Sequence, residues 1–148
     1  MQDQDAIGAI IIDDDDLFRS LWEHVMKMAE VDILGVAANG ADGLAMFAEK
    51  KPAMVLLDIR MPGMDGHEVL TRIRELDPSA YVLMVSAFKD FKTISESMGG
   101  GAQDYLRKDL PIEQIVERMK AHVARYRAGD LTTITERLAE DIQENDAG

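Results

Sequence analysis

The chain has 148 residues, of which 47% are hydrophobic, and this is enough to bury the core of one domain. Its formal net charge is −12, so it should repel polyphosphate backbones, and we expect no direct nucleic-acid binding by this chain. It has no cysteines, which excludes disulfides and thiolate metal sites. No apolar run approaches the ~20 residues of a membrane helix, and no signal peptide is evident, so we predict a cytoplasmic protein without membrane contact.

The first predicted strand ends in a cluster of acids. Residues 6–12 form an apolar run of strand length, and four aspartates follow at 13–16. An acidic run is often only a solvated loop, but this one follows a predicted buried strand directly. Asp13 and Asp14 are therefore candidates for a site at the end of that strand.

The segment after the acids has the spacing of an amphipathic helix. Its predicted apolar stripe consists of Leu17, Leu21, Val25 and Met28. Phe18 and Trp22 lie on an adjacent stripe, where aromatic side chains more often belong to the core. A second helix is expected from Asn39 onward.

Residues 54–66, with the sequence MVLLDIRMPGMDG, form the most informative segment of the chain. The continuous apolar run at 54–57 is typical of a strand covered on both faces, and Pro62 and Gly63 prevent regular structure beyond it. Asp58 is thus placed at the carboxyl edge of a buried strand, where ligands bind in open α/β sheets. The alternative is a loop aspartate that caps the next helix, which is expected at 66–74.

Two further strands end in polar side chains that could complete a site. The apolar run at 81–85 ends in Ser86, and the run at 104–106 leads to Lys108. If Asp13, Asp14 and Asp58 converge to ~4 Å, each ionised pair costs on the order of 4 kcal/mol at an effective dielectric constant of 20. A hard divalent cation would offset this repulsion, and Mg²⁺ suits a site with few carboxylates and room for water, carbonyl and phosphate oxygens.

Strand and helix patterns alternate five times along the chain. The fourth helix is expected at 91–98, and Pro111 opens the fifth at a helix-start position. Such alternation with short connections predicts an α/β fold with a parallel sheet, right-handed crossovers and helices on both faces.

These motifs resemble the receiver domain of bacterial two-component response regulators, of the CheY-like superfamily, over residues 6–127. The resemblance is carried by IIIDDDD at the first strand, VLLDIRMPGMDG at the third, VLMVSAF at the fourth and GAQDYLRKD at the fifth. It implies a flavodoxin-like, doubly wound sheet of five strands in the order 2-1-3-4-5. In that order the ends of strands 1 and 3 lie side by side.

The resemblance also assigns roles to individual residues. It implies that Asp58 is the phosphoacceptor, that Asp14 binds Mg²⁺ directly and that Asp13 holds a metal-bound water. The backbone carbonyl of Arg60 would complete the protein ligands of the metal. The remaining assignments are a phosphoryl-binding hydroxyl, a phosphoryl-binding cation and a switch aromatic, which fall on Ser86, Lys108 and Tyr105.

Three features of the sequence depart from the common pattern of this family. Asp109 replaces the proline that usually follows the active-site lysine, which leaves the geometry of that loop open. Ser86 replaces the commoner threonine and keeps its hydroxyl. The glycines at 99–101 stand where alanines are more frequent, and we expect a mobile junction before the fifth strand.

The resemblance ends near residue 127, so we predict a receiver domain at 1–127 and a C-terminal helical extension or linker at 128–148. An apolar stripe resumes after Gly129, and Thr133 and Glu136 have capping-box spacing. This helix could fold back on its own domain, dimerise, or lead to an output domain. The three histidines (His24, His67 and His122) show no spacing typical of a metal site or catalytic base, and we expect surface or packing roles for them.

The implied function is a signalling switch without a separate substrate, and not an enzyme. A histidine kinase or histidine phosphotransfer protein would phosphorylate Asp58, with Phe18 and Leu21 as candidates for the kinase-docking face. Phosphorylation would change the surface of the fourth helix, fifth strand and fifth helix, and a homodimer could form. The alternatives are an unphosphorylated interaction module and a haloacid-dehalogenase-like phosphatase with its nucleophile on the first strand.

Overall fold

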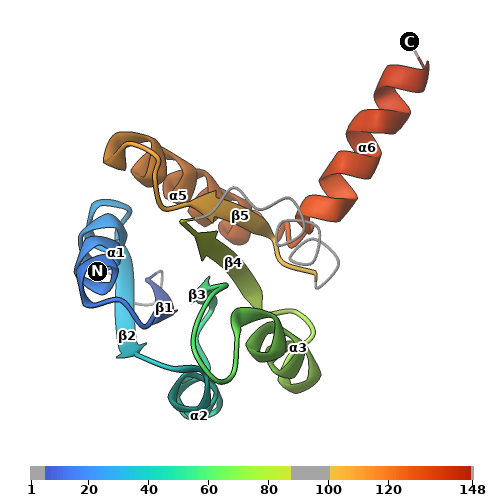
Figure 1. The fold of residues 1–148 in the computed structure, drawn as a ribbon. Coiled ribbons are helices and arrows are strands. Elements are labelled where there is room, and N and C mark those ends of the chain that lie inside the picture. The colour runs from blue at the N-terminus through green and yellow to red at the C-terminus, as the bar shows by residue number, and fades with distance from the viewer. Residues whose placement is uncertain (1–5, 88–100, 148) are drawn as a thin grey trace.

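The computed structural model describes residues 6–87 and 101–147, and the helix expected at 91–98 lies outside them. The described residues contain a parallel five-stranded sheet in the order β2-β1-β3-β4-β5 (Figure 1). This order confirms the predicted flavodoxin-like fold. The strands are β1 (Ile7–Ile12), β2 (Val31–Ala37), β3 (Met54–Asp58), β4 (Tyr81–Ser86) and β5 (Asp104–Arg107).

Helices pack on both faces of the sheet, and an acidic or amide side chain caps each of the first three. Asp15, Asn39 and Asp65 accept hydrogen bonds from backbone N–H groups of the first turn, as N-caps do. α1 and α5 lie on one face, while α2 and α3 lie on the other. The described helices are α1 (Asp16–Met28), α2 (Gly40–Lys50), α3 (Gly66–Leu76), α5 (Ile112–Arg127) and α6 (Ile134–Ala147).

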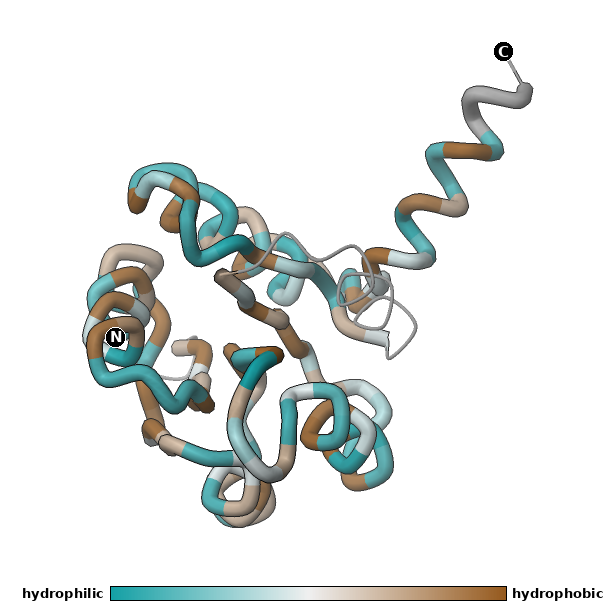
Figure 2. Tube along the Cα trace, viewed as in Figure 1, coloured by the Kyte–Doolittle hydropathy of each residue, from teal (hydrophilic) through white to brown (hydrophobic). Residues whose placement is uncertain are grey.

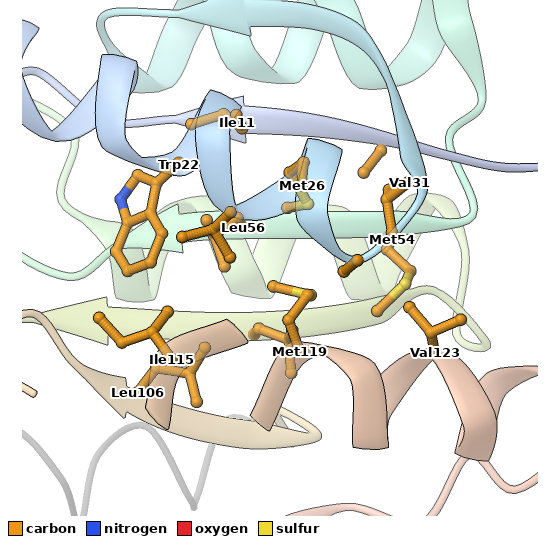
Figure 3. Close-up of a cluster of buried hydrophobic side chains, with 14 of the residues drawn as sticks. Ile11, Trp22, Met26, Val31, Met54, Leu56, Leu106, Ile115, Met119 and Val123 are labelled. Carbon is orange, nitrogen blue, oxygen red and sulfur yellow. The ribbon is translucent and has the colours of Figure 1, made fainter. Parts of the chain in front are cut away.

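The core consists of two apolar layers, one on each face of the sheet. All residues of β3 and β4 are buried, as expected for central strands covered on both faces. Figure 3 shows the layer beneath α1 and α5, where Trp22, Met26 and Met119 pack against the strands. In Figure 2, the strands accordingly appear as the hydrophobic centre of the domain. The carboxyl ends of the strands are therefore fixed by packing on both sides.

The buried face of α1 differs from the predicted stripe. Leu17 is 75% exposed and Met28 is 51% exposed, whereas Trp22, Val25 and Met26 are fully buried. The helix turns the large indole toward the sheet because its burial removes more apolar area from water than a leucine would. The predicted stripe at Leu17 and Met28 was wrong, and the aromatic stripe beside it faces the core.

The C-terminal segment is anchored to the start of β5. The N–H of Ile134 donates to the carbonyl of Ala102 at 3.1 Å, and the Gln103 side-chain amide donates to the carbonyl of Leu131 at 3.0 Å. The Arg137 guanidinium donates to the backbone carbonyl of Gln103 at 2.7 Å. These bonds join the first turn of α6 to the edge of the sheet.

Beyond its first turn, α6 projects away from the domain (Figure 1). The predicted capping box is confirmed, because the N–H of Glu136 lies 3.2 Å from the Thr133 hydroxyl and the Glu136 carboxylate accepts from Thr133. Among the side chains of α6 that the structure describes, two large apolar ones are exposed, Leu138 at 43% and Ile142 at 61%. The first turn of α6 is therefore fixed to the domain, whereas later residues of the helix expose apolar side chains to solvent.

Candidate functional site

The carboxyl ends of β1 and β3 bring the predicted carboxylates together. Ile12 pairs with Leu57 across the two strands, so Asp13 and Asp58 follow paired positions. Each of Asp13, Asp14 and Asp58 offers one carboxylate oxygen, and these oxygens lie within 4.8 Å of one another. Oxygen ligands gathered in this way could hold a hard divalent cation.

The loop after β3 returns so that Gly66 packs closely against the backbone of Asp58. The N–H of Gly66 donates to the carbonyl of Ile59 at 2.9 Å, and a Cβ at Gly66 would lie only 2.3 Å from the backbone oxygen of Asp58. A side chain at position 66 would therefore displace the loop. This close approach fixes the backbone that carries Asp58.

Asp13 is fully buried and both of its carboxylate oxygens are hydrogen-bonded. Oδ1 accepts from the N–H of Asp15 at 2.9 Å. Oδ2 lies 2.9 Å from Lys108 Nζ and accepts from the indole N–H of Trp22 at 3.2 Å. The contact from Trp22 was not predicted, because helical spacing identifies a buried aromatic residue but not the partner of its N–H.

Lys108 forms ion pairs with both buried acids, Asp13 and Asp58. Its ammonium nitrogen lies 2.9 Å from Asp13 Oδ2 and 3.2 Å from Asp58 Oδ2, and its side chain is only 5% exposed. The Phe18 ring covers it, with Nζ 4.3 Å from the ring centroid, which is a cation–π distance. Phe18 thus lies beside the site as well as on the helix that we expected to meet a partner.

The Asp58 carboxyl is strongly perturbed by its surroundings. Burial raises its pKa, and the neighbouring charge of Asp13 raises it further, whereas Lys108 lowers it; the resulting pKa is about 7. Oδ1 of Asp58 also accepts from the N–H of Arg60 at 3.1 Å. The carboxyl is therefore held in a fixed orientation but lacks enough positive charge to be fully ionised at neutral pH.

A pocket of ≈ 170 Å³ opens from these side chains to solvent. Asp14 is exposed, so it would contact a solute that enters the pocket. Asp58 and the side chain of Ser86 are buried at the base of the pocket. The pocket combines carboxylates with an ammonium group, which suits a cation together with an anionic group. Its lining residues are Asp14, Asp15, Phe18, Asp58, Arg60, Ser86, Ala87 and Lys108.

The loop around Asp109 is held by an ion pair. The Arg107 guanidinium donates twice to the Asp109 carboxylate, at 2.9 and 2.7 Å, and the backbone N–H of Lys108 donates to the carbonyl of Ser86 at 2.9 Å. Residues 6–87 and 101–147 contain no cis peptide bond. Lys108 therefore reaches the acids although proline is absent after it.

The predicted residues Tyr105 and Leu21 do not line the pocket. Tyr105 is partly buried against the layer under α2 and α3, and Leu21 is partly buried against the layer under α1 and α5. Gly101 has a positive φ of 84°, whereas the glycines at 99 and 100 lie outside the described residues. The expected mobile junction therefore stays a prediction.

A second buried polar cluster lies at the start of β5, away from the pocket. The Tyr81 hydroxyl lies 2.6 Å from His122 Nδ1, and His122 Nε2 lies 2.7 Å from Asp104 Oδ2. Burial would raise the pKa of Asp104, but hydrogen bonds from His122, Arg118 and the N–H of Tyr105 lower it to about 2. His122 thus has a packing role, as expected, although its hydrogen bonds were not foreseen.

Comparison with known proteins identifies the family. The sequence profile described as "Response regulator receiver domain" matches residues 9–120. The chain belongs to the response regulator receiver domain family. A receiver domain is the phosphorylatable signalling switch of two-component systems, and it is regulatory rather than catalytic.

Relatives of this receiver domain include single-domain and longer proteins. The chemotaxis protein CheY of Listeria monocytogenes is 32% identical over 75% of this chain and 93% of its own length. The transcriptional regulatory protein LnrK of Bacillus subtilis is 38% identical over 75% of this chain but only 51% of its own length. This chain therefore spans almost all of one relative and about half of the other.

A solved structure shares the fold of this receiver domain. The complex of CheX, CheY, BeF3 and Mg from Borrelia burgdorferi matches with a TM-score of 0.73 and 25% identity, over 78% of this chain and 88% of the matched chain.

Among the described helices, none is both long enough and apolar enough to cross a bilayer.

Proposed function

We propose that this receiver is switched by transfer of a phosphoryl group to the Asp58 carboxylate, with Mg²⁺ bound beside it. The observation that carries this proposal is the position of Asp58 at the base of a solvent-open pocket, 3.2 Å from Lys108 and within 4.8 Å of two further carboxylates. A nucleophile, a cation site and a fixed positive charge are thereby gathered around one carboxyl.

The charges at the site fit a divalent cation. Ionised Asp13, Asp14 and Asp58 carry three negative charges, and Lys108 supplies one positive charge, so a dication would bring the cluster to neutrality. Asp14, Asp58 and the backbone carbonyl of Arg60 would bind Mg²⁺ directly, and Asp13 would hold a metal-bound water. This set leaves positions for water and a phosphoryl oxygen, as Mg²⁺ usually does.

In the reaction, a carboxylate oxygen of Asp58 attacks the phosphorus of a phosphohistidine. The phosphorus–nitrogen bond breaks, the imidazole leaves, and an acyl phosphate forms on Asp58. Lys108 and the hydroxyl of Ser86 would hold phosphoryl oxygens, while bound Mg²⁺ would neutralise charge on another. Hydrolysis of the acyl phosphate by water would reset the switch.

The donor would be a sensor histidine kinase or a histidine phosphotransfer protein that docks on α1. Phe18 contacts Lys108 at the site, which supports its assignment to this docking face, and Leu21 lies about one turn further along the same helix. The acidic chain would act in the cytoplasm, without direct nucleic-acid binding of its own.

The output would pass through β5 and α5. A phosphoryl group on Asp58 would draw in the Ser86 hydroxyl and allow the partly buried Tyr105 to turn inward. We divide the chain into a receiver at 1–127 and an extension at 128–148 that carries the change to a second copy or to a further domain. Hydrogen exchange at residues 101–106, with and without beryllofluoride, tests this path, and Ser86→Ala should weaken the difference while phosphorylation at Asp58 persists.

Mass spectrometry tests the central proposal. Incubation with acetyl phosphate and Mg²⁺ should add one phosphoryl group, and Asp58→Asn should abolish the addition. Asp32→Asn, which removes an exposed acid of β2, serves as the control and should be phosphorylated normally. A phosphoryl group retained by Asp58→Asn would refute the assignment.

The same experiment tests the first alternative, and the surroundings of Asp13 weigh against the second. An unphosphorylated interaction module would gain no mass in any variant. A haloacid-dehalogenase-like phosphatase would use an acid after β1, but Asp13 is fully buried and engaged by Lys108 and Trp22, which favours Asp58 as the nucleophile.

A further inference from the structure

The indole of Trp22 connects α1 to the acidic site. Trp22 is fully buried, and its Nε1–H donates to Asp13 Oδ2 at 3.2 Å. Figure 3 shows the ring at the edge of the apolar layer, with its nitrogen on the side away from Met26 and Met54. The ring therefore fills the core while its one polar atom reaches a carboxylate of the site.

The hydrogen bonds of Asp13 differ in what happens to them when a cation arrives. Oδ2 accepts from both Trp22 and Lys108, but the Lys108 ammonium is shared with Asp58 at 3.2 Å. A cation among the carboxylates would repel this ammonium and compete with it for the same oxygens. The indole N–H carries no net charge, so it can hold Asp13 whether or not a cation is present.

Packing alone does not account for an indole at this position. A buried N–H without an acceptor would cost its full desolvation free energy, whereas an apolar side chain would carry no such penalty. Asp13 accepts the hydrogen bond that offsets the desolvation cost of the indole N–H, and the surrounding core fixes the direction of that bond. The pair is thus a rigid contact between the apolar layer and the site.

We propose that Trp22 is a positioning residue for Mg²⁺ binding, which acts by holding the Asp13 carboxylate while Lys108 moves between the acids and the phosphoryl group. This inference rests on the proposed function, in which Asp13 holds a metal-bound water. Partners that orient the groups around a metal commonly change its affinity 10- to 100-fold when they are removed. Loss of the N–H should therefore weaken Mg²⁺ binding about tenfold, at the lower end of that range.

The chain contains a single tryptophan, which permits an almost isosteric test. Expression in a tryptophan-requiring host supplied with benzothienylalanine replaces the indole N–H of Trp22 with sulfur and alters no other residue. Mg²⁺ affinity is then measured by titration calorimetry on both proteins. Met26→Leu, which changes a buried residue of the same helix and core layer without touching Asp13, is the matched control and should keep the original affinity.

A second measurement uses the unmodified protein, so it does not depend on how the variant folds. The single indole N–H gives one resonance in a ¹H–¹⁵N spectrum, and we expect it to shift with Mg²⁺ at the midpoint found by calorimetry. A merely structural indole would give a resonance that stays in place and a sulfur variant with unchanged affinity, and either result would overturn the inference.

The outcomes separate this inference from the function on which it rests. If the unmodified protein binds Mg²⁺ and is phosphorylated on Asp58 but the sulfur variant binds Mg²⁺ equally well, only the role of Trp22 is wrong. If the unmodified protein neither binds Mg²⁺ nor accepts a phosphoryl group, the proposed function fails as well.

Discussion

The ammonium group of Lys108 lies 3.2 Å from the Asp58 carboxylate, yet the pKa of Asp58 is raised to about 7. Burial and the charge of Asp13 thus outweigh the attraction of a lysine that is shared between two acids. A carboxyl whose pKa is raised in the folded state costs stability as the pH rises above its pKa in the unfolded chain, and the cost is complete once the pH passes the folded-state pKa. The site should therefore cost stability in the absence of metal.

We predict that Asp58→Asn stabilises the metal-free protein above neutral pH. The pKa of Asp58 is about 7 in the folded protein and its ordinary value is 3.8, so the cost of ionising Asp58 appears as the pH rises above ~4 and is complete above ~7. At pH 8 the free energy of unfolding should rise by on the order of 2 to 4 kcal/mol, measured by urea denaturation. The gain should be absent at pH 4, and Asp32→Asn should show no comparable dependence.

Mg²⁺ should raise the melting temperature by mass action, because it binds the folded site alone. At a concentration tenfold above its dissociation constant the gain is about 1.4 kcal/mol, or roughly 4 °C for a chain of this size. Asp14→Ala should remove this response, because Asp14 is the exposed carboxylate of the cluster. An undiminished shift in Asp14→Ala would place the metal elsewhere, and Asp32→Asn provides the control for lost charge.

Phe18 and Leu21 should behave differently although both lie on α1. The Phe18 ring contacts the Lys108 ammonium, so Phe18→Leu should slow phosphorylation by acetyl phosphate about threefold to tenfold, as expected for loss of a partly buried cation–π contact. Leu21→Ala should slow only transfer from a protein donor. Equal rates with acetyl phosphate for Phe18→Leu and the unmodified protein would show that the ring does not support Lys108.

The buried Asp104 should stabilise the domain in its ionised form. Its pKa is lowered to about 2 from 3.8, so its contribution is fully present above pH ~4 and is lost as the pH falls through ~2. Asp104→Asn should lower the free energy of unfolding by at least about 2 kcal/mol at pH 7, with a smaller difference at pH 3. Denaturant titrations at the two pH values check this, and a difference that does not change with pH would contradict it.

Arg137 should hold the base of α6 on the domain. Its guanidinium donates to the carbonyls of Gln103 and Thr132 at 2.7 and 3.0 Å, and Arg137→Ala would leave both acceptors without this donor. We expect faster hydrogen exchange in residues 134–143 and a loss of roughly 1 to 3 kcal/mol in the stability of that segment. Arg72→Ala, which removes an exposed arginine of α3, should leave this exchange unchanged.

The strands and the position of the site could be predicted because central parallel strands have a distinctive sequence. Continuous apolar runs that end in Asp58 and Ser86 indicate burial on both faces, and the strand order then brings their carboxyl ends together. The geometry around Asp13 and Asp58 follows from this topology. The polar side chains at the strand ends could thus be identified from the sequence alone.

Contacts between polar atoms of different elements could not be predicted in the same way. Periodicity indicated that Trp22 was apolar and helical, but only the packed helix shows its N–H beside Asp13. Likewise, nothing in the spacing of Tyr81, Asp104 and His122 indicates that they share a buried network. Leu17 was misplaced because two neighbouring helical stripes were both apolar, and only tertiary packing decides which one faces the sheet.

The attachment of α6 at one end gives the helix the properties of a lever. Its 14 residues correspond to a length of about 21 Å, and hydrogen bonds from its first turn fasten it to the start of β5. A tilt of about 10° at that fastening would sweep the far end through about 4 Å. A displacement at the sheet edge too small to remodel the domain would thus arrive at the tip of the helix several times enlarged.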